Sequence, residues 1–312
     1  MEDTCNKYLL SKILSAIHRL QSLKQAYFSI VAESTISETP PSLSIIDKTY
    51  WTVRHSRSQL TYTFLISAGQ KLIRLYFCPA SYQGFESSKA IFSVKAGSFT
   101  LLSNFNSSTT TTTHDQHTFH KEFCINVEED GRLNITFTRS HNHQDAYAFI
   151  NGIEKSSMPP NLYYTKAEDA PLKFLGQLNP YRVEKSNALE TLYRINVGGA
   201  PISPASDTGM YGTWFDWYND YLTDARPRAF LVNSINQTAE TEADVIQWSG
   251  GNGVPVCRDY AVRIGSEGNE KTKNLTIFLH SACEGKTKYS DAILNGLEIF
   301  KVDSDKNLAG AS

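Results

Sequence analysis

Carboxylate and histidine side chains are the first candidates for chemistry in this sequence. The acidic run from Glu128 to Asp130 precedes Gly131 and is typical of a solvated turn, not of the paired carboxylates of a glycosidase. Three histidines recur at every third residue from His114 to His120. They lie in a polar loop that leads into a strand, where they would not share a helical face as metal ligands do. We expect neither a carboxylate pair nor a metal site here.

No other pattern in the chain supports catalysis or a cofactor. The stretch SGGNGVP from Ser249 is rich in glycine, but no helix with Lys-Ser or Lys-Thr follows it, so it does not predict a phosphate-binding loop. The sequence contains no nucleophile elbow and no VAIK-type lysine, HRD loop or DFG motif. We therefore expect a non-enzymatic chain with no cofactor, no metal and no kinase activity.

Cysteine spacing and net charge exclude two further classes of site. The five cysteines show no CxxC spacing, which argues against structural zinc. Their odd number leaves at least one thiol unpaired in a secreted protein, and the disulfide pairing stays open because strand cysteines are often small buried hydrophobes. The net charge of −2 gives no basic footprint for nucleic acid.

Aromatic side chains give the strongest prediction of a ligand site. Tyr82 and Phe85 follow the strand KLIRLYF in a turn. Exposed rings bind sugars because the C–H face of a pyranose is apolar, so a glycan site at this loop requires both rings to be at least half exposed. A second aromatic stretch, DTGMYGTWFDWYNDYL, contributes Trp214 and Trp217 as candidates. In both places, packing within the fold is the alternative.

Glycosylation sequons are the only modification motifs that the sequence presents. The chain is rich in Asn, Ser and Thr, so sequons permit an extracellular location without demonstrating it. The four sequons are at Asn106, Asn134, Asn236 and Asn274.

The first 35 residues predict a short helical leader. Apolar residues recur at helical spacing from Leu9 to Leu20, while charges interrupt the apolar stretch at Lys12 and Lys24. A signal peptide needs an uninterrupted apolar stretch, so we interpret residues 1–35 as an appended helix and not as a signal peptide. No run of 18 apolar residues occurs that would span a membrane.

The elements after Pro41 have the pattern of an all-β protein. Short runs of β-branched and aromatic residues such as LTYTFLIS, KLIRLYF and LNITFT are separated by turn residues. In LNITFT the apolar residues Leu133, Ile135 and Phe137 alternate with polar ones, as in a strand with one buried face.

An internal repeat indicates a tandem duplication. DAYAFINGIEK from Asp145 returns as DAILNGLEIFK from Asp291, and HKEFCINV and NITF have counterparts in the same order downstream. We expect each repeat to end in a hairpin, because Asn-Gly supplies the two positive φ angles of a type I′ turn. The turns are Asn151-Gly152 and Asn295-Gly296.

These motifs resemble the malectin-like ectodomains of plant receptor kinases in the Feronia and Anxur group. The resemblance covers about residues 36–304 and includes LETLYRINVGG, DTGMYGTWFDWYNDYL and VIQWSGGNGVPVCRDYAV. It implies two tandem β-sandwich domains of the jelly-roll type. We place the first domain at 36–157, a linker at 158–188 and the second domain at 189–304.

The resemblance also implies an extracellular location at the plant plasma membrane and cell wall. Its implied partners are a secreted peptide of the rapid alkalinization factor type with a GPI-anchored coreceptor, and pectin or another cell-wall glycan. The chain departs from the family pattern by lacking the opening strands of the first domain, a segment after Leu222, a signal peptide and the membrane span with its kinase. A stand-alone carbohydrate-binding protein and a non-functional truncated gene product are therefore the alternatives.

Overall fold

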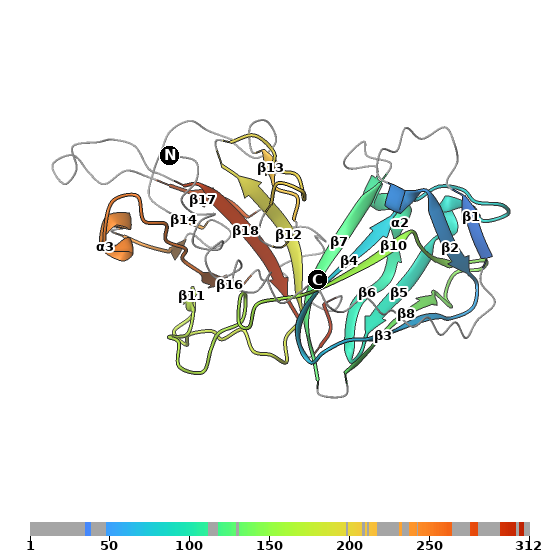
Figure 1. The fold of residues 1–312 in the computed structure, drawn as a ribbon, viewed down its shortest axis with the longest axis horizontal. Coiled ribbons are helices and arrows are strands. Elements are labelled where there is room, and N and C mark those ends of the chain that lie inside the picture. The colour runs from blue at the N-terminus through green and yellow to red at the C-terminus, as the bar shows by residue number, and fades with distance from the viewer. Residues whose placement is uncertain are drawn as a thin grey trace.

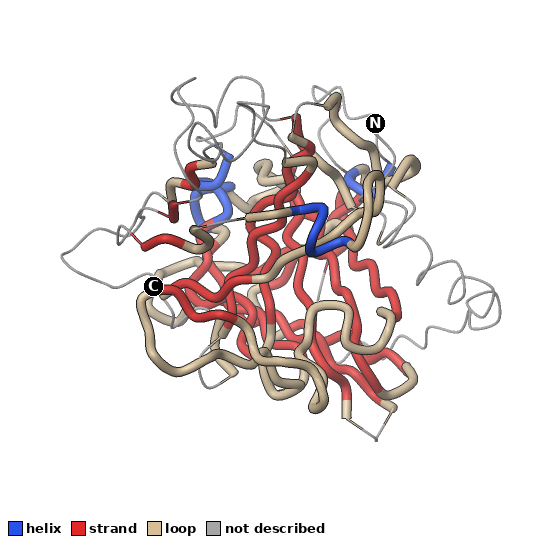
Figure 2. The backbone as a smooth tube through the Cα atoms, turned by 90° about the vertical axis from the view of Figure 1, so that its left-hand side faces the viewer, coloured by secondary structure: helices blue, strands red, loops and turns tan. Residues whose placement is uncertain are grey.

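A computed structural model describes most of the chain outside its N-terminal segment. The described residues are 35–38, 48–111, 118–128, 131–197, 199–207, 210, 212–216, 231–232, 237–241, 243–263, 275–279, 294–303 and 306–308. The expected helical leader, apart from Thr35, falls outside them. Strands dominate the described chain, which confirms the all-β class (Figure 2).

In the first half of the chain, residues 35–157, the described residues form ten strands and three short helical turns. In Figure 1 this half occupies the right-hand side. Its strands are β1 (Thr35–Glu38), β2 (Thr52–Ser56), β3 (Leu60–Leu65), β4 (Gly69–Phe77), β5 (Ile91–Ala96), β6 (Phe99–Asn106), β7 (Phe119–Val127), β8 (Arg132–Arg139), β9 (Ala148–Ile150) and β10 (Gly152–Ser157). Its helical turns are η2 (Lys48–Tyr50), η3 (Ser87–Lys89) and α2 (Ser107–Thr111).

In the rest of the described chain most elements are short, apart from the last strand and the strand that begins at residue 189. We call the part from residue 189 onward the second half. The strands after residue 157, which include one from the segment between the halves, are β11 (Lys173–Leu175), β12 (Leu189–Asn196), β13 (Phe215–Asp216), β14 (Leu231–Val232), β15 (Gln237–Thr238), β16 (Tyr260–Val262), β17 (Ile277–Phe278) and β18 (Gly296–Val302). One helix, α3 (Val245–Ser249), begins after Asp244, whose side chain accepts a hydrogen bond from the Gln247 N–H.

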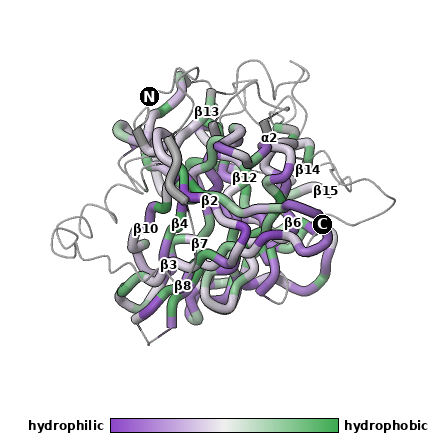
Figure 3. The backbone as a smooth tube through the Cα atoms, turned by 90° about the vertical axis from the view of Figure 1, so that its right-hand side faces the viewer, coloured by the Kyte–Doolittle hydropathy of each residue, from purple (hydrophilic) through white to green (hydrophobic). Residues whose placement is uncertain are grey.

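Two sheets form the body of the first half. A four-stranded sheet has the order β3-β8-β5-β6, and β10, β4 and β7 belong to a six-stranded sheet. The expected alternation is confirmed along β8, where Leu133, Ile135 and Phe137 are buried and Asn134 is exposed. Apolar and polar residues alternate along such strands in Figure 3. The buried residues form one cluster rich in aromatic side chains, including Phe77, which contacts four other phenylalanine rings.

The six-stranded sheet continues from the first half into the second (Figure 1). Its order is β10-β4-β7-β12-β13, and β18 pairs with β12. Strands β7 and β12 join the halves through three register pairs, from Leu189 opposite Cys124 to Thr191 opposite Glu122. The halves therefore share backbone hydrogen bonds, in addition to the chain segment that links them.

Residues 158–188, expected to be an inter-domain linker, pack against this shared sheet. Met158, Tyr164 and Val183 are buried in one cluster with Leu72 and Leu189 of the sheet. This segment therefore covers one face of the sheet and is part of the core. The domain boundaries themselves stay predictions.

The expected hairpin at Asn151-Gly152 is wrong. Strand β9 pairs with β2 in a three-stranded sheet, whereas β10 pairs with β4 in the six-stranded sheet. The chain therefore changes sheets at Asn151. Its side-chain oxygen accepts a hydrogen bond from the Cys78 N–H at 2.8 Å, and its amide nitrogen donates to the Tyr50 and Thr52 carbonyls at 3.3 and 3.0 Å.

The expected positive φ angles at Gly152 and Gly296 are also wrong, since neither residue has a left-handed backbone. Glycine is needed at these positions for close approach. A Cβ atom at residue 152 would overlap the Thr49 Cγ2 methyl group, and one at residue 296 would lie 3.3 Å from the Trp214 ring. Asn295 lies just before β18 and, through its carbonyl, accepts a bond from the Val197 N–H at 2.9 Å.

Candidate functional site

Five charged side chains on neighbouring strands of the six-stranded sheet contact one another. Arg74 on β4 lies opposite Glu154 on β10 and opposite Glu122 on β7. Across the junction, Arg194 on β12 lies opposite Glu298 on β18. Negative and positive side chains therefore alternate across both halves. We call these five residues the junction network.

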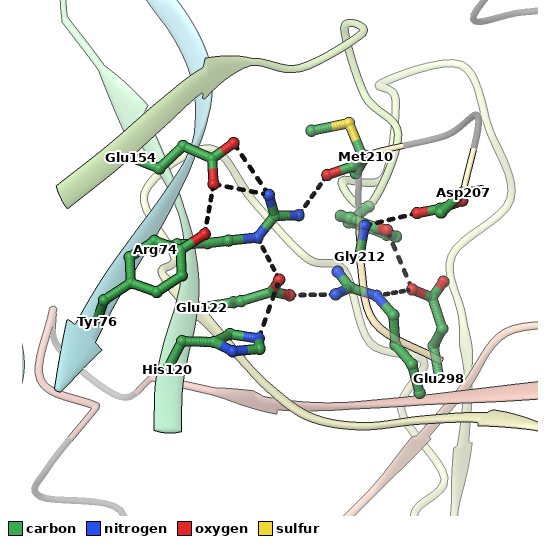
Figure 4. A network of polar contacts seen from close by, with 11 residues as sticks. Arg74, Tyr76, His120, Glu122, Glu154, Asp207, Met210, Gly212 and Glu298 are labelled. Atoms are coloured by element: carbon green, nitrogen blue, oxygen red, sulfur yellow. Dashed lines mark hydrogen bonds and ion pairs between the residues drawn. The ribbon is translucent and has the colours of Figure 1, made fainter. Parts of the chain in front are cut away.

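Arg74 is the centre of the network in the first half. Its Nε donates to Glu122 Oε1, and its Nη1 donates to both oxygens of Glu154 at 3.1 and 3.0 Å (Figure 4). Its Nη2 donates to the Met210 carbonyl, which belongs to the second half. The Tyr76 hydroxyl donates to Glu154 at 2.8 Å. One guanidinium thus binds both halves of the molecule.

Arg194 makes the matching contacts from the second half. Its Nη1 donates to Glu122 Oε2, and its Nε donates to Glu298 at 2.8 Å. The Tyr163 hydroxyl donates to the same Glu298 oxygen at 3.2 Å. A Cβ atom at Gly212 would lie 2.7 Å from Arg194 Nη1, so glycine lets the backbone pass over the guanidinium. Glu122 therefore accepts from one arginine of each half.

Burial and the neighbouring charges together set the pKa values of the side chains in the junction network. The side chains of Arg74, Glu122 and Arg194 are each 4% exposed. Burial would raise the pKa of Glu122, but the two arginines outweigh it and lower that pKa. At Glu298 burial prevails over Arg194, and the pKa is raised. Burial likewise lowers the pKa of His120, whose Nε2 lies 3.7 Å from Glu122.

The junction network has the properties of a structural connection and lacks those of a catalytic centre. Both Glu122 oxygens are bonded to arginines, so this carboxylate is not free to act as a base. The neighbouring Cys124 thiol is buried, and burial raises its pKa, which disfavours the nucleophilic thiolate. Among the described residues, no group of three or more His, Cys, Asp or Glu side chains is placed to hold a metal ion.

The expected exposure of Tyr82 is wrong, because only 4% of this residue is accessible. Its hydroxyl donates to the Cys78 carbonyl at 2.5 Å, and its ring packs near those of His55 and Phe149. Phe85 is also less exposed than a glycan site would need, because it is partly buried and packs against the core cluster. Its ring lies 4.2 Å from that of His55, and the Arg57 guanidinium lies 4.7 Å from the centre of the Phe85 ring. The turn between the two residues is closed by reciprocal backbone bonds. Tyr82 therefore packs within the fold, which was the alternative to a glycan site at this loop.

The second aromatic candidate pair is only partly described. Trp214 is half-buried, exchanges two backbone hydrogen bonds with Ile202 and lies against Gly296 of β18. Trp217 lies outside the described residues. The sugar platform proposed for this stretch stays a prediction.

Two of the four sequons can be located in the structure. Asn134 is exposed in β8 and accepts a bond from the Thr63 hydroxyl at 2.8 Å. Asn106 ends β6, and its side-chain oxygen accepts from the Ser108 N–H and hydroxyl at 3.1 and 2.7 Å. Asn236 and Asn274 fall outside the described residues. Glycosylation at these positions stays a prediction.

The sequence contained a signal for the junction network that motif searching missed. Arg74, Glu122, Arg194 and Glu298 each interrupt an apolar strand pattern, in LIRLYF, HKEFCINV, LYRIN and LEIFK. Charged residues in such positions are rarely buried unless they are paired. Four of them on predicted strands would have indicated pairing, although not which strands are neighbours.

Comparison with known proteins identifies the family. The family model of the malectin-like domain matches residues 25–248, which is more than half of the chain. The chain belongs to the malectin-like family. The matched range covers the first half and the segment 158–188, and it extends into the second half as far as residue 248.

Curated relatives are plant receptor kinases. The receptor-like protein kinase FERONIA of Arabidopsis thaliana is 34% identical over 373 aligned positions, which include 94% of this chain and 41% of the relative. ANXUR1 of the same species is 29% identical, with 90% of this chain and 41% of the relative covered. This malectin-like chain thus spans about two fifths of the length of these relatives. Because the FERONIA alignment is longer than 312 residues, FERONIA has internal segments without a counterpart here.

Solved structures of ectodomains agree with the malectin-like fold. The crystal structure of the plant receptor-like kinase FER matches with a TM-score of 0.74 and 33% identity over 92% of each chain. A structure of the plant peptide RALF23 in complex with FER and LLG2 matches with a TM-score of 0.76, 32% identity and the same coverage. These matches lie outside the kinase part of such receptors. No helix in the described part of the chain is long and apolar enough to cross a membrane.

Proposed function

We propose that this chain is the ligand-sensing part of a plant receptor, located at the extracellular side of the plasma membrane. Its ligand is a secreted signalling peptide of the RALF type, bound together with a coreceptor of the LLG2 kind. The observation that carries this proposal is the match over 92% of the chain to a structure of RALF23 in complex with FER and LLG2.

The junction supports a sensing role for the whole molecule. The shared sheet, the junction network and the packed segment 158–188 fix the orientation of the two halves. A binding surface composed of both halves needs such a fixed orientation, because ordering flexible parts on binding costs free energy. The absence of a catalytic group at the buried charges favours recognition over chemistry.

The proposal is tested by calorimetric titration of the full 312-residue chain with synthetic RALF23, in the presence and absence of purified LLG2. We expect binding that LLG2 strengthens and that a scrambled peptide of the same composition does not reproduce. If the folded chain fails to bind peptide with LLG2 present, the proposed function is wrong.

The same titration with the FERONIA ectodomain tests the effect of the internal segments that this chain lacks. We expect this chain to bind the peptide more weakly than FERONIA, because surface that those segments supply is missing. Equal affinities would show that the missing segments do not contribute to binding.

A further inference from the structure

The chain returns from the second half to the first after β18. Asp303, directly after the strand, is buried and binds the end of segment 158–188. Its carboxylate accepts from the Ala188 N–H at 2.9 Å and from the Asn187 amide at 3.3 Å, and its own N–H donates to the Ala188 carbonyl at 3.0 Å. This anchor fixes where the chain leaves the second half.

The returning chain then pairs with β6, the edge strand of the four-stranded sheet. The Thr100 N–H donates to the Lys306 carbonyl at 2.9 Å, and the Thr100 carbonyl accepts from the Leu308 N–H at 3.0 Å. Asn307 lies opposite Thr100 in a parallel bridge. An edge strand has unpaired backbone groups, and the returning chain satisfies those of Thr100.

Two further observations show that this contact is specific. Leu308 is 1% exposed and belongs to the buried cluster of the first half. Lys306 has a φ angle of +62°, a left-handed conformation that residues with a Cβ rarely adopt, and its Nζ lies 5.8 Å from the Phe99 ring centre. Burial of the apolar Leu308 side chain is favourable and offsets the strain at Lys306.

We propose that Asp303 and residues 306–308 act as a strap that binds the β6 edge as a peptide ligand would and fixes the orientation of the two halves. The recognised features are extended backbone, which pairs with Thr100, and an apolar side chain, which enters the core. The occupant is a segment of this chain itself, because its anchor, its pairing and its buried leucine are all present. The inference is independent of the peptide ligand proposed above.

The strap is tested on the full chain with a matched pair of substitutions, Lys306→Pro and Lys306→Gly. Proline cannot adopt the φ angle of +62°, whereas glycine adopts it without strain. We expect hydrogen exchange of the Thr100 amide to be at least 10-fold faster in K306P and unchanged or slower in K306G. Amides paired between β4 and β7 should exchange as in the wild type in both variants. Equal exchange of Thr100 in the two variants would overturn the proposal.

A rescue experiment tests whether the strap acts as a separable ligand. Leu308→Ala removes the apolar anchor, and Leu178→Ala at a fully exposed leucine is its control. We expect faster Thr100 exchange in L308A only, and recovery when a synthetic peptide of residues 303–312 is added. Faster exchange throughout β4 and β7 would show a general core role for Leu308, and a failure of the peptide to restore protection would show that the site is not a peptide-binding edge. Either result contradicts the strap.

Discussion

Arg194 has the largest expected effect among single residues. Replacing Arg194 by Met keeps most of the volume but removes a donor to the buried Glu122, and it leaves the partly buried Glu298 with only Tyr163 as a donor among the contacts described for that carboxylate. Removing one partner of a buried ion pair costs about 3–5 kcal/mol. We expect R194M to lower the free energy of unfolding, measured by urea titration, by this amount.

The control for R194M is Arg182→Met, at an exposed arginine bonded to the Lys166 and Asp169 carbonyls. Exposed contacts of this kind contribute about 1 kcal/mol or less. Adding Glu298→Gln to R194M removes the stranded charge and should recover part of the loss. Similar losses in R194M and R182M would show that burial does not strengthen the junction network.

Glu122 predicts a pH dependence of stability. Its pKa in the folded state is lowered below the ordinary value of 4.5, so its contribution is fully present above that value and is lost as the pH falls through the lower, folded pKa. We expect Glu122→Gln to be less stable than the wild type at pH 7, with a difference that shrinks below about pH 4.5. Urea titrations from pH 7 to pH 3 measure it, and a difference independent of pH would contradict the assignment.

A substitution at Gly152 tests the close approach to Thr49, which the structure shows in place of the expected turn. We expect Gly152→Ala to cost about 1–3 kcal/mol, because the added methyl overlaps the Thr49 Cγ2 group. Thr49→Ser removes that methyl group, so the double variant should recover part of the loss in thermal unfolding. Gly296→Ala, where the nearest atom is 3.3 Å away, should cost less. Additive effects of G152A and T49S would show that the overlap is relieved elsewhere.

For single residues, the sequence indicated which positions are structurally important more reliably than it indicated the contacts that make them important. Asn151 and Gly152 were expected to be structural, and they are, but the strand switch depends on contacts with Tyr50 and Thr52 about 100 residues upstream. The burial of Tyr82 likewise depends on His55 and Phe149, which the local pattern does not place beside it.

At the scale of elements, Asn151 lies where the chain passes from one sheet to another. Its side-chain hydrogen bonds are not repeated among the contacts described for Asn295. The two asparagines occupy equivalent positions in the repeat, yet only the side chain of Asn151 makes three described hydrogen bonds to backbone groups. We expect Asn151→Ala to cost about 2–4 kcal/mol, at about 1 kcal/mol for each bond with a penalty for unpaired groups. Asn295→Ala, at an exposed side chain, should cost less than about 0.5 kcal/mol. Chemical unfolding of both variants gives the comparison, and equal costs would show that the repeats are equivalent here.

The strand patterns predicted the existence of elements well and their neighbours poorly. Alternation identified β8 because one face of that strand is buried, whereas β4 is buried on both faces and was recognised by its β-branched and aromatic residues. The pairing of β7 with β12 involves residues more than 60 positions apart and no local signal. The network of charges across five strands therefore could not be predicted from the sequence, although each charge could be recognised as unusual.

At the scale of the whole molecule, we expect the two halves to form one cooperative unit. The shared sheet, the junction network and the strap all extend from one half to the other. Independent domains would unfold in separate steps, whereas shared backbone pairing couples them. We therefore do not expect the predicted tandem repeats to be separate units of stability.

Differential scanning calorimetry tests this coupling. We expect a single transition for the wild type, and two for Glu190→Pro. At residue 190 strand β12 has neighbours on both sides, Phe123 of β7 and Lys301 of β18, and proline cannot occupy a central strand without breaking its pairing. Glu190→Ala is the control, because it removes the ion pair with Lys121 at 2.5 Å and keeps the backbone bonds. E190A should therefore keep one transition at a slightly lower temperature. Two resolved transitions in the wild type would show that three register pairs, the network and the strap are too weak to couple the halves.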